Sequence, residues 1–337
     1  MYETFFRLTG KPFQLNPDPA FFFGSRGHKR AFAYLQYGVH QSEGFIIITG
    51  EVGAGKTTLV RNLLEHIDPT HLVAAQLVST QLDAEDLLRA VAIAFGLTTK
   101  TTDKAQLLAE LEAFLVSLVP QSKRALLIVD EAQNLSGRAI EELRMLSNFQ
   151  LGSQGLLQSF LLGQPELRQL MQSPELQQLR QRVTASYHLG PMDRAESQAY
   201  VEHRLRHVGW ASDPRFEHGA FDAIYSFSAG IPRRINTLCN RVLLAAALSE
   251  KHDITASDVD ATADEIKFEL GAPNIAVADA WAAAAKLDGL GFGDGKPALG
   301  LEDRVVRLER AMTATLDLLQ QMRRPAATAS PPDQVEG

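Results

Sequence analysis

The sequence predicts an α/β fold, a three-layer sandwich in which helices cover both faces of a five-stranded parallel sheet. Between residues 43 and 190, short apolar runs alternate with stretches whose apolar residues recur at helical spacing. Runs that are apolar on both faces and separated by helices are typical of a parallel sheet covered on each side. The five expected strands are 45–49, 72–79, 125–129, 159–163 and 184–189.

The region after the sheet is expected to be helical. Residues 191–268 carry no strand pattern, and we expect them to form a small helical lid domain directly after the sheet domain at 43–190. Its four expected helices are 193–208, 217–228, 233–250 and 256–268.

The two ends of the chain differ from this middle part in composition. Residues 1–42 are rich in aromatic residues and proline (PFQLNPDPAFFFG) before a helical pattern, whereas 269–300 are rich in Ala, Gly, Asp and Pro and predict a flexible linker. Residues 301–323 carry an amphipathic, heptad-like stripe of about three heptads with Thr315 at a core position. Either this short coiled-coil-like helix serves docking or self-association, or it is an inert amphipathic tail. Residues 324–337 predict disorder.

Composition limits the classes of function. The 337 residues, 45% apolar and 22% charged, suffice for one large domain or two modest ones. A net charge of −7 argues against a chain whose whole surface binds nucleic acid, although a local basic patch is compatible with it. The single cysteine, Cys239, cannot form an internal disulfide and favours a reducing compartment. The sequence shows neither a signal-peptide pattern nor an apolar run of about 18–20 residues, so we expect a cytoplasmic protein.

A phosphate-binding loop is predicted in ITGEVGAGKTTLV. The pattern Gly50-x4-Gly55-Lys56-Thr57 follows an expected strand and opens an expected helix, which distinguishes it from a chance glycine loop. Glycines let backbone N–H groups surround a β-phosphate, and the helix N-terminus adds its positive dipole end. Lys56 is expected at the β and γ oxygens, and the Thr57 hydroxyl at Mg²⁺. The expected nucleotide contacts in the loop are Gly50, Glu51, Val52, Gly53, Ala54, Gly55, Lys56, Thr57 and Thr58.

Polar residues follow two other strands at the edge where open α/β sheets bind ligands. In LLIVDEAQNL, Asp130 ends a buried strand and is expected to hold Mg²⁺ through water. Adjacent carboxylates at the end of a buried strand need a cation or a proton, so Glu131 is expected to polarise the attacking water; the alternative is that it only caps the loop. Gln133 either orients that water or bonds only the backbone. Gln164, at the end of SFLLG, is expected near the γ-phosphate.

Together, these motifs resemble a known family. YETFFRLTGKPFQLNPDP, GEVGAGKTTL, VDEAQNL, LLGQPEL, LRQRV and GIPRRINTL resemble the general secretion pathway protein A group of AAA+ ATPases over about residues 1–265. LRMLSNFQLG and LRQRVTASYHLGPM are similar to the subgroup encoded with PEP-CTERM/exosortase and exopolysaccharide clusters. The resemblance implies a cytoplasmic ATPase that uses ATP and Mg²⁺ and helps to assemble or energise an envelope export system. Founding members continue through a transmembrane helix to a periplasmic peptidoglycan-binding domain. That continuation is not seen here, so we expect the chain to reach the inner membrane only through membrane-associated secretion or polysaccharide-export partners.

The resemblance also implies roles for three arginines. Arg182, or alternatively Arg180, would reach from one protomer into the nucleotide site of the next within a homo-oligomer, expected to be a ring; surface salt bridges are the alternative. In Gly230-x-x-Arg233 the arginine would read the γ-phosphate from the lid, unless it belongs to an ordinary basic helix start. In related ATPases the segment before the sheet wraps the adenine. The N-terminal aromatic residues, with His28 as a polar edge, would do so here or would seal the underside of the sheet.

Two other functions compete with this hypothesis. A DNA-directed ATPase of the transposition-helper or origin-binding type would share the DEAQ-like loop, and LRHVGWASDPR offers some positive charge. The acidic total and the lack of a recognisable winged-helix or helix-turn-helix module after the lid make nucleic acid an unexpected partner. A regulatory switch, whose nucleotide state carries the signal, would hydrolyse ATP very slowly.

Overall fold

The computed structural model describes residues 2–41, 44–68, 70–78, 82–98, 101, 103–152 and 154–269. Of the linker predicted at 269–300, only Glu269 is described. The short helix predicted at 301–323 and the tail lie outside the described residues. Within the described part of the chain, no helix is both long enough and apolar enough to cross a membrane.

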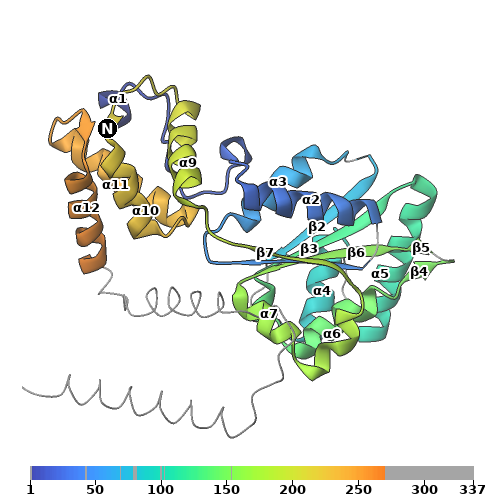
Figure 1. The fold of residues 1–337 in the computed structure, drawn as a ribbon. Helices are drawn as coiled ribbons and strands as arrows, with labels where there is room; N and C mark the ends of the chain where they lie inside the picture. The colour runs from blue at the N-terminus through green and yellow to red at the C-terminus, as the bar shows by residue number, and fades with distance from the viewer. Residues whose placement is uncertain are drawn as a thin grey trace, which may run out of the picture. The chain divides into compact units, whose positions relative to one another are not determined.

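The central sheet has five parallel strands in the order β2-β3-β6-β1-β7 (Figure 1). The predicted α/β fold with a five-stranded parallel sheet is therefore confirmed. All six residues of β1 are buried, since β6 and β7 pair with it on either side. The strands are β1 Phe45–Gly50, β2 Leu72–Val78, β3 Arg124–Asp130, β6 Leu157–Gly163 and β7 Val183–Leu189.

Two helical layers cover the two faces of the sheet, as Figure 1 shows. Alternate strand residues point to opposite faces, so Ile46 and Ile48 enter one core while Phe45 and Ile47 enter the other. The first core is covered by α2 Arg26–Gln41 and α3 Lys56–His66. The second is covered by α4 Ala84–Ala94, α5 Lys104–Leu118, α6 Gly137–Leu146 and α7 Pro165–Met171.

Short elements complete the sheet domain. They are the 3-10 turns η2 Val119–Gln121, η3 Ala132–Asn134 and η4 Pro174–Leu176, the hairpin strands β4 Gln150–Leu151 and β5 Gln154–Gly155, and the helix α8 Gln177–Arg180.

Four helices follow the sheet domain and form the lid: α9 Arg194–His207, α10 His218–Ser228, α11 Pro232–Leu248 and α12 Ala256–Glu269. The prediction of no strand in 191–268 is wrong in one detail. Two-residue strands, β8 Arg215–Phe216 and β9 Asp253–Ile254, pair in parallel. A strand of two residues is too short for alternating polarity to appear in the sequence.

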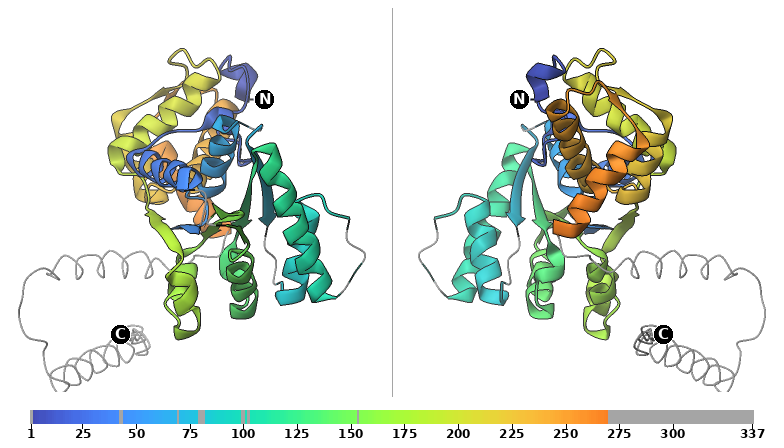
Figure 2. Two further views of the ribbon diagram at one scale, coloured as in Figure 1. Left: turned by 90° about the vertical axis from the view of Figure 1, so that its right-hand side faces the viewer. Right: turned by 90° about the vertical axis from the view of Figure 1, so that its left-hand side faces the viewer.

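The N-terminal segment shares one hydrophobic core with the lid helices. It contains the short helix α1 Tyr2–Phe5 and the 3-10 turn η1 Pro19–Phe21, and Phe13 is almost fully buried in that core. Figure 2 shows the N-terminus beside the lid helices in both side views. The buried aromatic rings of this segment therefore pack on the lid, whereas the partly buried Phe22 packs against the sheet core under α2 and α3.

Candidate functional site

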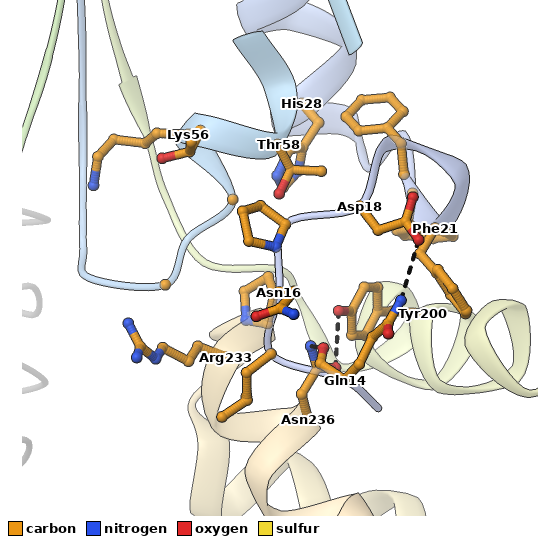
Figure 3. Close-up of a pocket in the computed structure, with 18 of the residues that line it drawn as sticks. Gln14, Asn16, Asp18, Phe21, His28, Lys56, Thr58, Tyr200, Arg233 and Asn236 are labelled. Atoms are coloured by element: carbon orange, nitrogen blue, oxygen red, sulfur yellow. Dashed lines mark hydrogen bonds between the residues drawn. The ribbon is translucent and has the colours of Figure 1, made fainter. Parts of the chain in front are cut away.

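A pocket lies where three parts of the chain meet (Figure 3). The phosphate-binding loop contributes Val52, Gly53 and Gly55 through Thr58, and Glu131 lies beside it. The N-terminal segment contributes the opposite wall, with residues 14–18 and 21–23. The lid supplies Met192, Tyr200, Arg204, Pro232, Arg233 and Asn236, and His28 from α2 completes the lining.

The loop has the backbone geometry of an anion cradle. Gly53 and Gly55 have φ angles of 80° and 97°, in the left-handed region that favours glycine. Lys56 is the first residue of α3, so the N-terminus of that helix adjoins the loop. The Lys56 Nζ donates hydrogen bonds to the carbonyl oxygens of Gly50 at 2.6 Å and Glu51 at 3.0 Å. Burial lowers the pKa of Lys56, while the nearby carboxylates, chiefly Glu131 and Asp130, act in the opposite direction.

The residues expected to hold magnesium lie in contact. Thr57 Oγ1 donates to Asp130 Oδ2 at 2.8 Å, and Asp130 is only 5% exposed. The other oxygen, Asp130 Oδ1, accepts the backbone N–H of Glu131 at 2.9 Å. A hydroxyl and a carboxylate oxygen beside a phosphate cradle are the donor set that Mg²⁺ prefers. These residues therefore fit a nucleotide-bound Mg²⁺.

Glu131 is held by two amide side chains. Its backbone is left-handed, with φ 54°, and its side chain makes no capping hydrogen bond to the turn that follows. Glu131 Oε2 accepts from Gln133 Nε2 at 2.6 Å and from Gln164 Nε2 at 3.1 Å. Gln133 Oε1 in turn accepts the backbone N–H of Gln164 at 2.9 Å. Burial acts to raise the pKa of Glu131, but the two amides and Lys56 outweigh it and hold that pKa below its usual value.

The lid begins directly against the loop. The backbone N–H of Arg233 donates to the carbonyl of Gly53 at 3.2 Å. A Cβ on Gly53 would lie 2.2 Å from the Arg233 Cβ, so only glycine allows this approach. Arg233 lines the pocket, as Figure 3 shows, whereas the adjacent Arg234 does not.

The sequence did not reveal a buried network on the lid side of the pocket. Arg204 is 6% exposed, and its guanidinium donates to the carbonyls of Pro12 at 2.6 Å and Gln14 at 3.0 Å. It also lies 4.5 Å from the centre of the Phe21 ring and donates to Tyr200 Oη at 3.3 Å. One signal was present: this arginine lies on the apolar stripe of α9, where a solvated residue would not be expected.

Arg180 and Arg182 lie far from this pocket. The backbone carbonyl of Arg182 accepts from Phe45 N at 2.9 Å, at the start of β1, whereas the loop follows the end of that strand. Five residue steps along a strand span roughly 17 Å. The Arg182 guanidinium donates to the carbonyl and hydroxyl of Ser147, both at 3.1 Å. Arg180 donates to two carbonyls, those of Met171 and Ser173.

The fold and the loop define the class of protein. This is a P-loop NTPase fold of the AAA type, and residues 39–171 match the family described as AAA domain. The ADP form of Aeropyrum pernix ORC2 has a TM-score of 0.56 at 16% identity, over 86% of this chain and 85% of that chain. Drosophila ORC bound to DNA has a TM-score of 0.53 at 17% identity, over 86% and 78% of the two chains. At these identities the likeness concerns the fold alone.

A curated relative is similar in sequence as well. The chain is 39% identical over 267 residues to general secretion pathway protein A of Aeromonas hydrophila. The aligned part covers 79% of this chain and 48% of the relative, so the chain spans about half of the relative's length.

Proposed function

We propose that this protein is a Mg²⁺-dependent ATPase. The observation that carries the proposal is the contact between Thr57 and Asp130 beside the Glu131–Gln164 pair, all at one end of a glycine-bounded loop. Mg²⁺ would supply charge neutralisation at the β and γ oxygens. It would be held by Thr57 and, through water, by Asp130. Lys56 would bind those oxygens, with the loop N–H groups around them.

In hydrolysis, Glu131 would act as the general base. Because its pKa lies below the usual value, the carboxylate is charged at neutral pH and can accept a proton from an attacking water. Gln164, which donates to that carboxylate, would position it and contact the γ-phosphate. Arg233, from the lid, would contact the same phosphate and link its presence to lid closure.

A second protomer would complete the site. Arg182 cannot reach its own pocket from the opposite end of β1, but it is exposed, which leaves it accessible to a neighbouring copy. In this role Arg182, or alternatively Arg180, would stabilise transition-state charge in the next subunit of a ring. Arg180 is exposed too, and its guanidinium is bound to two carbonyls of its own chain.

The work done with ATP would be export across the cell envelope. The similarity to general secretion pathway protein A supports a role in assembling or energising an envelope export system. We place the protein in the cytoplasm, attached at the inner membrane through secretion or polysaccharide-export partners, and in the subgroup associated with PEP-CTERM/exosortase and exopolysaccharide clusters. A pull-down from membranes with the Glu131→Gln form in ATP tests this. Recovery of no envelope export protein, together with DNA-stimulated and salt-sensitive hydrolysis, would favour the DNA-directed alternative.

Enzymology tests the ATPase itself. Glu131→Gln should bind ATP as the parent does and hydrolyse it about 10²–10⁴-fold more slowly, because the proton acceptor is lost. Lys56→Ala should lose binding, and Arg182→Ala should bind ATP but turn over about 10³-fold more slowly or worse. Binding is measured by calorimetry and turnover by phosphate release. A parent protein that binds no ATP, or a Glu131→Gln form that hydrolyses it at the parent's rate, would refute the proposal.

Mixing two inactive variants tests the shared site. Lys56→Ala retains the arginine and Arg182→Ala retains the pocket, so their mixed oligomers should recover part of the activity. Size analysis must first show that mixed oligomers form. No recovery at any protein concentration, despite mixed assembly, would show that the arginine does not act in trans.

A further inference from the structure

A buried histidine that lines the pocket packs against the phosphate-binding loop. His28, in the first turn of α2, is 6% exposed, and its Nε2 lies 3.0 Å from the carbonyl oxygen of Ala54. Its Nδ1 lies 2.7 Å from Ser25 Oγ. Both ring nitrogens are therefore engaged, which leaves neither for the adenine edge expected from the sequence.

The partners fix which nitrogen carries the proton. A carbonyl oxygen can only accept, so the hydrogen is on Nε2 and points at Ala54. The other nitrogen then accepts from the Ser25 hydroxyl, whose oxygen also accepts the backbone N–H of His28 at 3.2 Å. Burial lowers the pKa of His28, while the Ala54 carbonyl and Glu196 act in the opposite direction. The ring is thus a neutral donor with a single tautomer.

The bond to Ala54 determines where the next N–H points. In a trans peptide, the carbonyl of Ala54 and the N–H of Gly55 point in opposite directions. Holding the carbonyl toward His28 therefore turns the Gly55 N–H away from it, to the side where the loop surrounds a phosphate. If this peptide flipped, a carbonyl oxygen would face the phosphate, and attraction would become repulsion.

The loop needs this restraint because it is rich in glycine. Gly55 has φ 97°, and glycine rotates between its allowed regions at little cost, so the chain alone does not fix the peptide. The space behind it is filled: a Cβ on Gly55 would lie 2.7 Å from His28 Nε2. The ring therefore stands against the loop at the position where the peptide would turn.

We propose that His28 is a positioning residue that fixes the Ala54–Gly55 peptide with its N–H toward the bound β-phosphate. Ser25 contributes by holding the ring in the required tautomer. This inference rests on the proposed nucleotide binding and adds a specific residue to it, outside the loop motif.

Two matched substitutions separate the hydrogen bond from packing. The side-chain nitrogen of glutamine reaches the place of histidine Nε2, whereas that of asparagine reaches only the place of Nδ1. His28→Gln should bind ADP within about threefold of the parent, and His28→Asn about tenfold more weakly, the value of one lost hydrogen bond. Ser25→Ala, which keeps the ring but frees its tautomer, should show an intermediate loss.

Affinity for ADP with Mg²⁺ is measured by calorimetry, and urea midpoints report the stability of each variant. Equal losses in His28→Gln and His28→Asn would show that the ring acts only by packing and would overturn the inference. If the asparagine form does not fold, Ser25→Ala decides: an affinity equal to that of the parent overturns the inference. If the parent protein itself binds no ADP, the proposed function is refuted. The other two outcomes overturn only the role of His28.

Discussion

The two sides of the pocket are built in different ways. On the sheet side, the functional groups come from short stretches at the ends of neighbouring strands, and contiguous loop residues supply most of them. On the lid side, they come from residues far apart in the chain: Arg204 bonds Pro12 and Gln14, which lie 192 and 190 residues away. The phosphate side thus depends on local backbone geometry, and the lid side on long-range contacts.

The electrostatics of the two sides differ too. The sheet side holds a lysine among carboxylates, and these groups shift one another's pKa values. Among the described residues, the buried Arg204 guanidinium instead makes its hydrogen bonds and ring contacts with neutral groups, namely two carbonyls, a tyrosine hydroxyl and two aromatic rings, and the Asp18 carboxylate acts on it only through space. A buried cation without a carboxylate in contact is held by the number of its hydrogen bonds. The lid side should therefore be the more sensitive to losing one side chain.

The largest expected effect tests that sensitivity. Arg204→Met keeps most of the volume but leaves the buried carbonyl of Pro12 without its donor, and the carbonyl of Gln14 keeps only the Asn236 amide at 3.4 Å. Each unsatisfied group costs about 1–3 kcal/mol, so the free energy of unfolding should fall by about 3 kcal/mol. Urea denaturation measures the change.

Arg206 is the matched control on the same helix. It is exposed and pairs with Glu202 at 2.5 Å, one helical turn away. Such surface pairs contribute little, so Arg206→Met should change the free energy of unfolding by no more than about 0.5 kcal/mol. Equal losses in the two variants would show that the buried guanidinium has no special part in joining the N-terminal segment to the lid.

A smaller effect is expected on the sheet side. Gln164→Leu removes one of the two amides that donate to Glu131. Because those hydrogen bonds hold the pKa of Glu131 low, their loss raises it, and the acidic limb of the rate profile moves to higher pH. At neutral pH, kcat should fall about tenfold, or 1.4 kcal/mol of transition-state stabilisation.

The measurement is kcat at saturating MgATP across the acidic range. The shift in the limb separates this role from a structural one, since a loss of folding alone would lower kcat without moving the limb. A limb that stays in place would mean that Gln164 does not control the ionisation of Glu131.

The same contrast explains what the sequence could predict. The five strands were predictable because each forms a buried run with its own local pattern, and the loop because its residues are contiguous. The link from Arg204 to Pro12 leaves no local pattern, and neither does the support of Ala54 by His28, 26 residues earlier. The role proposed for Arg182 would require a second protomer, and no contact within one chain bears on it.

The smallest expected effect concerns a carboxylate in the first turn of the last lid helix. Asp258, in the first turn of α12, accepts from Lys251 Nζ at 2.6 Å and from the backbone N–H and hydroxyl of Thr255. The Lys251 hydrogen bond and those from Thr255 outweigh burial and lower the pKa of Asp258 to about 2.

The sign of the pH dependence follows from that depressed pKa. The charged carboxylate stabilises the fold above the unfolded value of 3.8, and the contribution is lost as pH falls toward about 2. Asp258→Asn should therefore cost about 0.5–1 kcal/mol at pH 7, since water screens the ion pair and mainly the contacts at the helix start are lost. The difference between variant and parent, measured in urea, should shrink as pH falls below 3.8. A difference that stays constant with pH would assign the effect to shape and not to charge, and the lid helices would then depend on packing at both of their ends.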